Sequence, residues 1–180
     1  GNASIGEVED AVDVCRSEGN EDIIIHNCPS GYPARLESIN LKLIPTLKRM
    51  FPHYPIAYSD HTPGWEMDVA ALALGANLVE KTITTDRTIR SVEHIFSLEP
   101  KEMRHFIQTI RDIEKAMGQP RRVLHPEERE KRKSVRRSVF LKTPVQAGQK
   151  LGDVDVDFRR PGYGVAPDMY EQITDFTFRH

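Results

Sequence analysis

The chain has 180 residues, of which 38% are hydrophobic, and this is enough for one sizeable core in a single domain, with a small appendage as the alternative. The formal net charge of −2 gives no general attraction to nucleic acid or to a membrane surface, and no apolar run is long enough to cross a bilayer. The two cysteines form neither a metal-binding spacing nor a disulfide framework, so we expect a cytoplasmic protein whose partner is a small molecule or another protein chain.

The first fifty residues predict a helix, a strand and a second helix. Ser4 and Glu7 form a capping-box pattern at the start of an amphipathic helix. The β-branched run within 22–28 fits a fully buried strand. Apolar residues then recur at helical spacing over 36–50, where Pro45 either kinks the helix or marks its real first turn.

The segment 55–62 is the best candidate for a strand that carries functional side chains. Its short apolar run ends abruptly in Ser59, Asp60 and His61. In α/β proteins, side chains of a functional site are commonly delivered by the carboxyl ends of the strands. Taken alone, the same run also fits an ordinary polar turn. A short helix is predicted next, over 66–74.

A third strand, predicted over 77–84, is followed by a long loop and a long helix. The loop between Thr84 and Leu98 has no apolar period, and loops of this length in compact α/β units are usually functional. Pro100 opens the helix, an apolar stripe runs along it, and Gly118 ends it. This alternation predicts parallel strands joined by right-handed crossovers.

The composition changes after residue 118. Over 119–137, eight Lys and Arg stand against three Glu, which indicates an exposed linker, taken as 119–135, with a nucleic-acid or nuclear-import role as the weaker alternative. Short strand-like pieces at 138–141, 150–152 and 154–158, separated by Gly and Pro turns, then predict a small β-rich domain over 136–180. The remaining part, 1–118, is the α/β domain.

Polar residues follow each of the three predicted strands. The carboxyl ends of parallel strands face one rim, so these side chains are expected to surround one polar cavity. Three strands are too few for a closed barrel, and an open parallel sheet would leave bare edges, so the chain is expected to be a piece of something larger. The rim residues are Asn27, Ser30, Tyr32, Ser59, Asp60, His61, Glu80, Lys81, Thr82, Glu93 and His94.

In these motifs the chain resembles the sialic acid synthase family, which includes synthases of N-acetylneuraminate, legionaminic acid, pseudaminic acid and spore-coat polysaccharides. The resemblance runs over nearly the whole chain. It implies the last three strands of a TIM (β/α)8 barrel, followed by part of a small antifreeze-like (SAF) β domain. The matching segments are Cys28 with 30–33, then 58–62, 73–76, 79–81, 97–100, 136–138 and 159–162.

The family resemblance also implies an activity. It is a transferase reaction that joins phosphoenolpyruvate to the open-chain aldehyde of an N-acylated hexosamine, releases phosphate and yields a nonulosonic acid for bacterial surface polysaccharides. A divalent metal, usually Mn2+ with Mg2+ or Co2+ as alternatives, polarises the aldehyde oxygen. The resemblance further implies a domain-swapped homodimer, and the isolated fragment is expected to be inactive.

The same resemblance assigns roles to five residues. His61 is implied as a metal ligand and a catalytic residue. Ser59 and Ser30 are implied to contact phosphoenolpyruvate, and Tyr32 the sugar. Arg160 is implied to reach from the β domain of one subunit into the active site of the other, where it meets the N-acyl group. Each of three residues also has a purely structural alternative. His61 could be a hydrogen-bonded turn histidine, Tyr32 an aromatic ring packed on a proline turn, and Arg160 an exposed arginine.

Two positions depart from the family pattern. The family commonly has a second metal-binding histidine where this chain has Thr82, and a histidine where this chain has Asn27. A threonine hydroxyl is a much poorer ligand than imidazole for manganese-class ions. Glu93 and His94 match an acid and a histidine of many relatives and are expected to be catalytic and metal-binding, respectively. His26 is expected to face away from Asn27 and to be structural.

A second function remains open. A non-catalytic sugar- or anion-binding module of the same fold is favoured by Thr82 and by the absence of the first half of the barrel, which by resemblance carries the lysines for phosphate and a catalytic acid.

Overall fold

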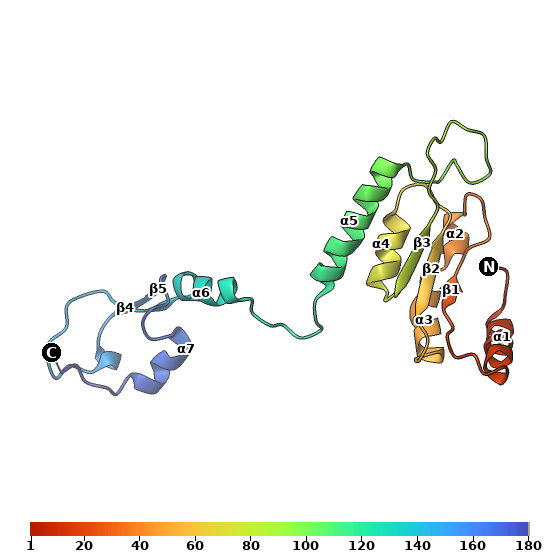
Figure 1. Cartoon of the computed structure of the whole chain (residues 1–180). Helices are drawn as coiled ribbons and strands as arrows, with labels where there is room; N and C mark the ends of the chain where they lie inside the picture. Colours follow the sequence, from red (N-terminus) through yellow and green to blue (C-terminus); the bar gives the residue numbers. More distant parts are fainter. Residues whose placement is uncertain (180) are drawn as a thin grey trace. The chain divides into compact units, whose positions relative to one another are not determined.

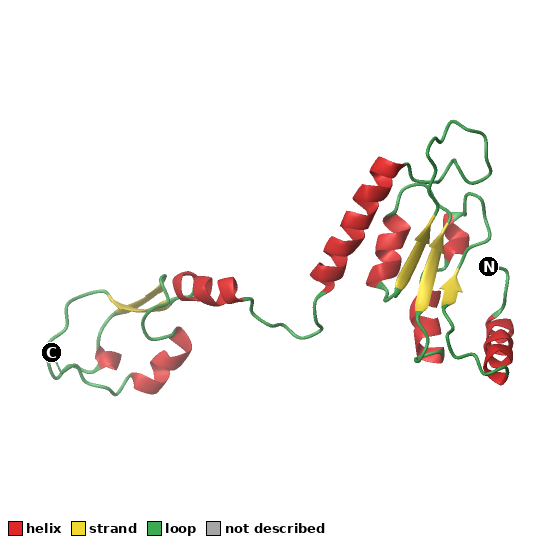
Figure 2. Ribbon diagram, viewed as in Figure 1, coloured by secondary structure: helices red, strands yellow, loops and turns green. Residues whose placement is uncertain are grey.

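The computed structural model describes residues 1–179, which belong to two compact units, Gly1–Gly118 and Gln119–His180 (Figure 1). The first unit contains a three-stranded sheet with helices packed against it, and the second contains a two-stranded sheet (Figure 2). Within residues 1–179, no helix is both long and apolar enough to cross a membrane.

The first unit has the predicted α/β organisation. Its strands are all parallel, with β2 in the middle, so the prediction of parallel strands joined through helices is confirmed. The elements in chain order are α1 (Ile5–Ser17), β1 (Ile25–Asn27), α2 (Leu36–Ile39), α3 (Leu43–Met50), β2 (Ile56–Asp60), α4 (Glu66–Ala73), β3 (Leu78–Lys81) and α5 (Pro100–Met117).

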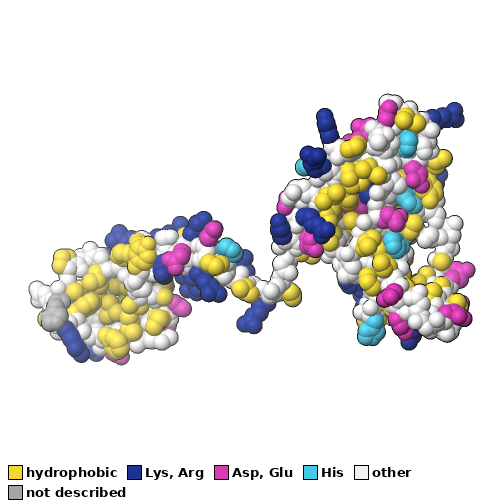
Figure 3. Space-filling model, viewed as in Figure 1, with side chains coloured by type: hydrophobic (Ala, Val, Ile, Leu, Met, Phe, Trp, Pro, Cys, Tyr) yellow, Lys and Arg dark blue, Asp and Glu magenta, His cyan; other side chains and the backbone are white. Residues whose placement is uncertain are grey.

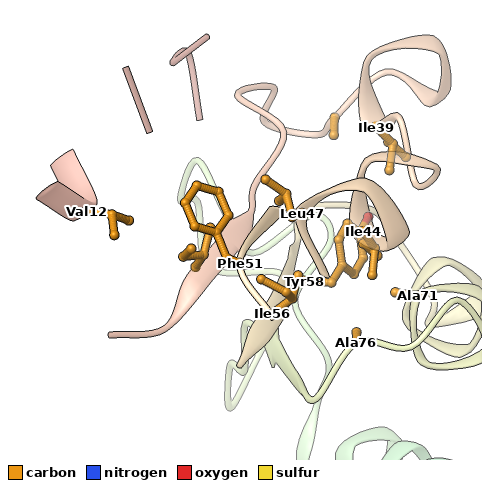
Figure 4. Close-up of a cluster of buried hydrophobic side chains, with 11 residues drawn as sticks. Val12, Ile39, Ile44, Leu47, Phe51, Ile56, Tyr58, Ala71 and Ala76 are labelled. Carbon is orange, nitrogen blue, oxygen red and sulfur yellow. The ribbon is translucent and has the colours of Figure 1, made fainter. Parts of the chain in front are cut away.

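One face of this sheet forms the core of the unit. Ile56 and Tyr58 of β2 are fully buried and belong to one hydrophobic cluster with Ile44 and Leu47 of α3 and Ala71 of α4 (Figure 4). Because side chains alternate along a strand, the residues between them face the opposite side of the sheet. This alternation decides which strand-end residues face the core and which face the site.

The helix predicted over 36–50 is two helices, so that prediction is wrong in one respect. Asn40 lies between them with a φ of +50°, in the left-handed region that Asn tolerates better than most residues. The amide of Leu43 then donates to the Asn40 carbonyl as α3 begins. Pro45 is the third residue of α3, where its missing N–H costs no helical hydrogen bond, which confirms the first-turn alternative.

The predicted caps are also present. The amide of Ser4 donates to Glu7 Oε2 at 2.7 Å and the Glu7 amide donates to Ser4 Oγ at 3.4 Å, so the capping box at α1 is confirmed. Pro100 occupies the first turn of α5, and Gly118 follows its last residue with a φ of +55°. Glycine adopts this conformation at little cost, so it ends the long helix.

The second unit is less rich in strands than the sequence predicts. Its only paired strands among the described residues are antiparallel, and the piece expected as a strand near Leu151 is a 3-10 turn. The other elements are helical or single bridges. In chain order they are α6 (Pro126–Val135), β4 (Ser138–Leu141), η1 (Leu151–Asp153), β5 (Val156–Arg159), α7 (Pro167–Tyr170) and η2 (Glu171–Ile173).

Helix α6 lies within the segment expected to be a linker. Pro126 takes its first position, and the His125 amide donates to Glu128 Oε2 at 2.8 Å, so local capping starts a helix that composition alone did not reveal. No residue of α6 is buried, and Lys and Arg side chains gather over it (Figure 3). Residues 126–135 of the basic run therefore form an exposed helix.

Candidate active site at the strand ends

The polar residues at the end of β2 divide between the two faces of the sheet. Tyr58 lies in the core cluster, and Asp60 shares its face. Ser59 lies on the opposite face, and His61 packs against aromatic rings outside the core cluster. The rim predicted from the sequence is therefore two groups, one buried beneath the sheet and one facing the candidate site.

His61 is held in a defined orientation. Its side chain is buried, with 7% of the residue exposed, and Nδ1 lies 3.0 Å from the carbonyl oxygen of Pro29. A carbonyl can only accept, so Nδ1 carries a proton, and in the neutral imidazole the lone pair is on Nε2. Metal-binding histidines commonly donate their other ring nitrogen to such a carbonyl, so His61 fits a metal ligand acting through Nε2.

Two aromatic side chains form a wall with His61. The Tyr32 ring stacks on the imidazole with centroids 4.6 Å apart and an interplanar angle of 25°, and the Phe96 centroid lies 5.8 Å from that of His61. Tyr32 is 52% exposed, so the ring is packed on one face and open to ligands on the other. The contact of Phe96 with His61 was not predicted, because a single Phe in a loop without an apolar period does not indicate where its ring packs.

Ser59 is paired with a carboxylate on the neighbouring strand. Its hydroxyl donates to Glu80 Oε1 at 2.8 Å, and the two residues are partners in the β2–β3 register. Ser59 is buried, whereas Glu80 is exposed. The sequence placed Glu80 at the rim without a role, and the structure makes it the acceptor that orients the Ser59 hydroxyl.

Asp60 and Lys81 do not face the predicted cavity, so that expectation is wrong. The ammonium group of Lys81 contacts Asp60 Oδ2 at 2.5 Å, and both side chains are almost fully buried on the core side. Tyr58 donates to Asp60 Oδ1 at 2.9 Å, and Thr62 donates to it through its amide at 3.1 Å and its hydroxyl at 2.9 Å. The reason is strand alternation, which turns the neighbours of Ser59 away from the site.

Asp68 of α4 completes this buried group and was missed from the sequence. Its Oδ2 lies 3.8 Å from Lys81 Nζ, and neither carboxyl oxygen has a hydrogen-bond partner among the described residues. Burial raises the pKa of Asp68 to about 8, the negative charge of Asp60 adds to the rise, and Lys81 opposes it. Asp68 is therefore protonated at neutral pH. Acidic residues near the start of a helix are usually exposed, so nothing in the sequence indicated that Asp68 is buried.

Tyr58 lies in the same buried group as Asp60 and is protonated there. Burial raises the pKa of Tyr58 above its ordinary value, and the charge of Asp60 acts in the same direction. The phenol therefore stays protonated and remains a donor to Asp60.

The loop residues predicted for the site lie on the long connection between β3 and α5. Phe96 brings this loop against His61. His94 is half-buried, and its Nδ1 lies 2.8 Å from the Ile89 carbonyl oxygen within the loop. Glu93 is exposed, and its backbone carbonyl accepts the Ser97 hydroxyl at 2.8 Å.

Three further residues fall in different places. Ser30 is exposed and directly follows Pro29, whose carbonyl holds His61. Thr82 has a buried hydroxyl oxygen without a hydrogen-bond partner among the described residues. Arg160 belongs to the second unit, is exposed, and donates from Nε to the Val135 carbonyl at 2.6 Å. Its predicted role across a dimer stays a prediction.

Asn27 rather than His26 is the structural residue of β1. Asn27 is buried and its Nδ2 donates to the Ile39 carbonyl at 3.2 Å, where it holds the end of α2. His26 is partly exposed and pairs in register with Ala57 of β2. The expectation that His26 is the structural residue is therefore wrong, because the core lies on the Asn27 face.

The described part of the chain does not contain a complete metal-binding set. Across residues 1–179, no three His, Cys, Asp or Glu side chains are grouped so that they could hold a metal ion. His61 fits a single metal ligand by its hydrogen bonding.

Comparison with known proteins connects this geometry to a family. The NeuB family profile matches residues 1–122. The N,N'-diacetyllegionaminic acid synthase of Campylobacter jejuni is 34% identical over 175 residues, which cover 96% of this chain and 52% of that protein. The N-acetylneuraminate-9-phosphate synthase of Mus musculus is 37% identical over 132 residues, which cover 73% and 37%.

Solved structures give the same result. The N-acetylneuraminic acid (sialic acid) synthetase of Leptospira borgpetersenii, in complex with citrate, matches with a TM-score of 0.65 and 35% identity over 73% of this chain and 45% of that one. The spore coat polysaccharide biosynthesis protein SpsE of Bacillus subtilis matches with a TM-score of 0.61 and 31% identity over 98% and 56%. The chain thus spans about half the length of the relatives it matches. Since the profile match includes all three parallel strands, the wall around His61 and the Ser59–Glu80 pair, the chain belongs to the NeuB family.

Proposed function

We propose that this chain forms part of a synthase that condenses phosphoenolpyruvate with an N-acylated hexosamine to give a nonulosonic acid and phosphate. Membership in the NeuB family and similarity to sialic, legionaminic and pseudaminic acid synthases support the proposal. One observation carries it: Ser59 and His61 lie side by side at the end of β2, with both polar groups oriented by hydrogen bonds and facing away from the core.

The proposed architecture is the C-terminal part of a TIM barrel. Parallel strands are normally buried on both faces, yet Leu78 on the site-facing side of β3 is 40% exposed. Among the described residues, β1 and β3 each have a neighbouring strand on one edge only. Further strands of a longer protein would pair with these edges and cover this face. We propose the second unit as part of an antifreeze-like domain that follows the barrel.

The chemistry assigned to the chain's own residues is binding and orientation. Ser59 would donate to phosphoenolpyruvate once its hydroxyl proton turns from Glu80 to the ligand, and Ser30 would contact the same ligand. Tyr32, stacked on His61, would contact the sugar. In the reaction, a new bond joins the enol carbon to the aldehyde carbon, the aldehyde oxygen takes a proton, and one water molecule is consumed as phosphate leaves. Glu93, exposed on the loop beside the site, is the proposed acid.

The proposal includes a divalent metal, Mn2+ with Mg2+ or Co2+ as alternatives. When bound, such an ion supplies Lewis-acid polarisation of the aldehyde oxygen. His61 is the ligand that this chain offers through Nε2. His94 is the second candidate, since its Nδ1 also lies against a backbone carbonyl.

The proposed assembly is a cytoplasmic, domain-swapped homodimer in which Arg160 meets the N-acyl group in the site of the other subunit. A guanidinium group suits such a fixed polar contact. The Nε of Arg160 donates to the Val135 carbonyl, which leaves the terminal N–H groups of the guanidinium for this contact.

The test is phosphate release by the full-length protein that contains this chain. We expect release from phosphoenolpyruvate only when an acylated hexosamine such as N-acetylmannosamine or a diacetamido hexose is present. Ser59→Ala should lower kcat/KM by about 10- to 100-fold, since it removes a hydrogen bond to a charged ligand worth roughly 1.5 to 3 kcal/mol. Ser134→Ala, on exposed α6, is the matched control.

A second function is supported by Thr82, whose hydroxyl is a much poorer ligand for manganese-class ions than an imidazole. It is a non-catalytic module that binds a sugar or an anion at the same strand ends. Calorimetric binding of phosphoenolpyruvate or the hexosamine without any phosphate release would favour this module over the synthase.

A further inference from the structure

A buried carboxylate lies directly between the two proposed site residues of β2. We call Asp60 with its three partners, Tyr58, Thr62 and Lys81, the Asp60 anchor. All four side chains lie on the core side of the sheet or at the strand end, and none is used by the chemistry proposed above.

The anchor is saturated with hydrogen bonds. Asp60 Oδ1 accepts from Tyr58 and from the Thr62 amide, and Oδ2 accepts from Lys81. The Thr62 hydroxyl lies 2.9 Å from Oδ1 and 3.0 Å from Oδ2, so its one proton is shared between them. Buried charges hydrogen-bonded in this way are rigid, because each departure leaves a charged group without a partner.

Lys81 cannot serve as a phosphate ligand or a nucleophile from this position. Its side chain is 1% exposed, and its ammonium group donates both to Asp60 and to the carbonyl of Thr62, at 2.5 Å in each case. It therefore ties the end of β3 to the chain just beyond the end of β2. The lysine acts on the site through the backbone.

The backbone that it holds is the one that carries the site. Asp60 is flanked by Ser59 and His61, so fixing its side chain and the turn at Thr62 fixes the direction in which both neighbours leave the strand. The same stretch is held from the other side, where the Ala34 amide donates to the His61 carbonyl at 2.9 Å.

We infer that Asp60 and Lys81 are positioning residues of the active site. The Asp60 anchor sets the orientation of the Ser59 hydroxyl and of the His61 imidazole, and neither Asp60 nor Lys81 contacts substrate. This inference rests on the proposed function for its kinetic consequence, whereas its structural consequence for His61 does not depend on turnover.

The test compares substitutions that touch the anchor at different points, in the full-length protein. Thr62→Val keeps the shape of the side chain and removes the hydroxyl that binds both oxygens of Asp60. Lys81→Met removes the ammonium group. Thr46→Val is the matched control, because it makes the same Thr-to-Val change on helix α3, where the lost hydroxyl bonds the Lys42 carbonyl and Arg49 and no member of the Asp60 anchor.

Two quantities are measured below the unfolding temperature of each variant. The first is the NMR signal of the Nδ1 proton that His61 donates to Pro29, identified by its loss in His61→Ala. The second is kcat/KM for phosphate release. We expect Thr62→Val to shift or broaden the His61 signal and to lower kcat/KM by about 10- to 100-fold, since misplacement by about 1 Å costs that much.

Thr46→Val should leave both quantities as they are in the unaltered protein. A normal His61 signal in Thr62→Val, or an equal kinetic loss in Thr46→Val, would overturn the inference. If Lys81→Met fails to fold, Thr62→Val still decides the matter. If the unaltered protein shows no turnover, the proposed function fails, and the His61 signal alone tests the positioning role.

Discussion

His61 is the residue on which the proposed chemistry depends most. Replacing it with Ala removes Nε2 and the ring on which Tyr32 stacks, so we expect turnover in the full-length protein to fall by at least about 100-fold. Steady-state phosphate release measures this, and circular dichroism checks that the fold is kept. His53→Ala, at an exposed position after α3, is the control. Undiminished activity in His61→Ala would remove His61 from the site.

Asp68 gives a prediction about stability and pH. Its pKa in the folded protein is about 8, above the ordinary value of 3.8. Between pH 3.8 and pH 8, the folded state therefore keeps a proton on Asp68 that the unfolded state has released. Stability therefore falls as pH rises through this window, by at most about 1.4 kcal/mol per pH unit from this group. Asp68→Asn keeps the neutral shape and should remove this contribution.

Denaturant unfolding at pH 5, 6.5 and 8 measures the effect. We expect Asp68→Asn to lose less stability than the unaltered chain between pH 5 and pH 8. Equal losses in the two proteins would mean that Asp68 is ionised in the folded state.

At this scale the sequence predicted which residues lie near the site better than it predicted their direction. Ser59, His61 and Tyr32 were placed correctly at the strand ends, because a polar run after an apolar strand marks that end. Alternation relates Asp60 to Ser59 but does not say which of them faces the core. That choice depends on the packing of α3 and α4, which no local pattern records.

Among the elements, the break between α2 and α3 gives a prediction about stability. Asn40 holds a φ of +50°, which disfavours residues with a Cβ and suits glycine. We expect Asn40→Ala to destabilise the first unit by about 1 to 2 kcal/mol and Asn40→Gly to be neutral or stabilising. Chemical denaturation compares the two variants, and an equal effect of both would show that the left-handed conformation is not what matters.

The elements themselves could largely be predicted. The capping box at Ser4 and Pro100 at the start of α5 are short-range signals, and both were confirmed. The split at Asn40 was missed, because apolar spacing continued across it while one backbone angle changed. Helix α6 was also missed, because its polar residues have no apolar period and the cap at Glu128 was not recognised.

At the scale of the whole molecule, the first unit leaves apolar surface uncovered. A groove of about 360 Å³ lies between β3 and α5, lined by Leu72, Leu78, Val79, Phe106 and Ile107 among others. Together with the open strand edges, this surface should make the 180-residue chain self-associate when produced alone. Light scattering after size-exclusion chromatography measures this, and a monodisperse, catalytically active monomer would contradict it.

The proposed function is the formation of a carbon–carbon bond between phosphoenolpyruvate and an acylated hexosamine. The most direct test is to incubate the full-length protein with phosphoenolpyruvate fully labelled with carbon-13, a divalent metal and N-acetylmannosamine or a diacetamido hexose. Mass spectrometry then identifies the product. We predict a nine-carbon α-keto acid that carries all three labelled carbons and retains the acyl group. Recovery of the label only as pyruvate or unreacted phosphoenolpyruvate, with every acylated hexosamine unchanged, would contradict the account.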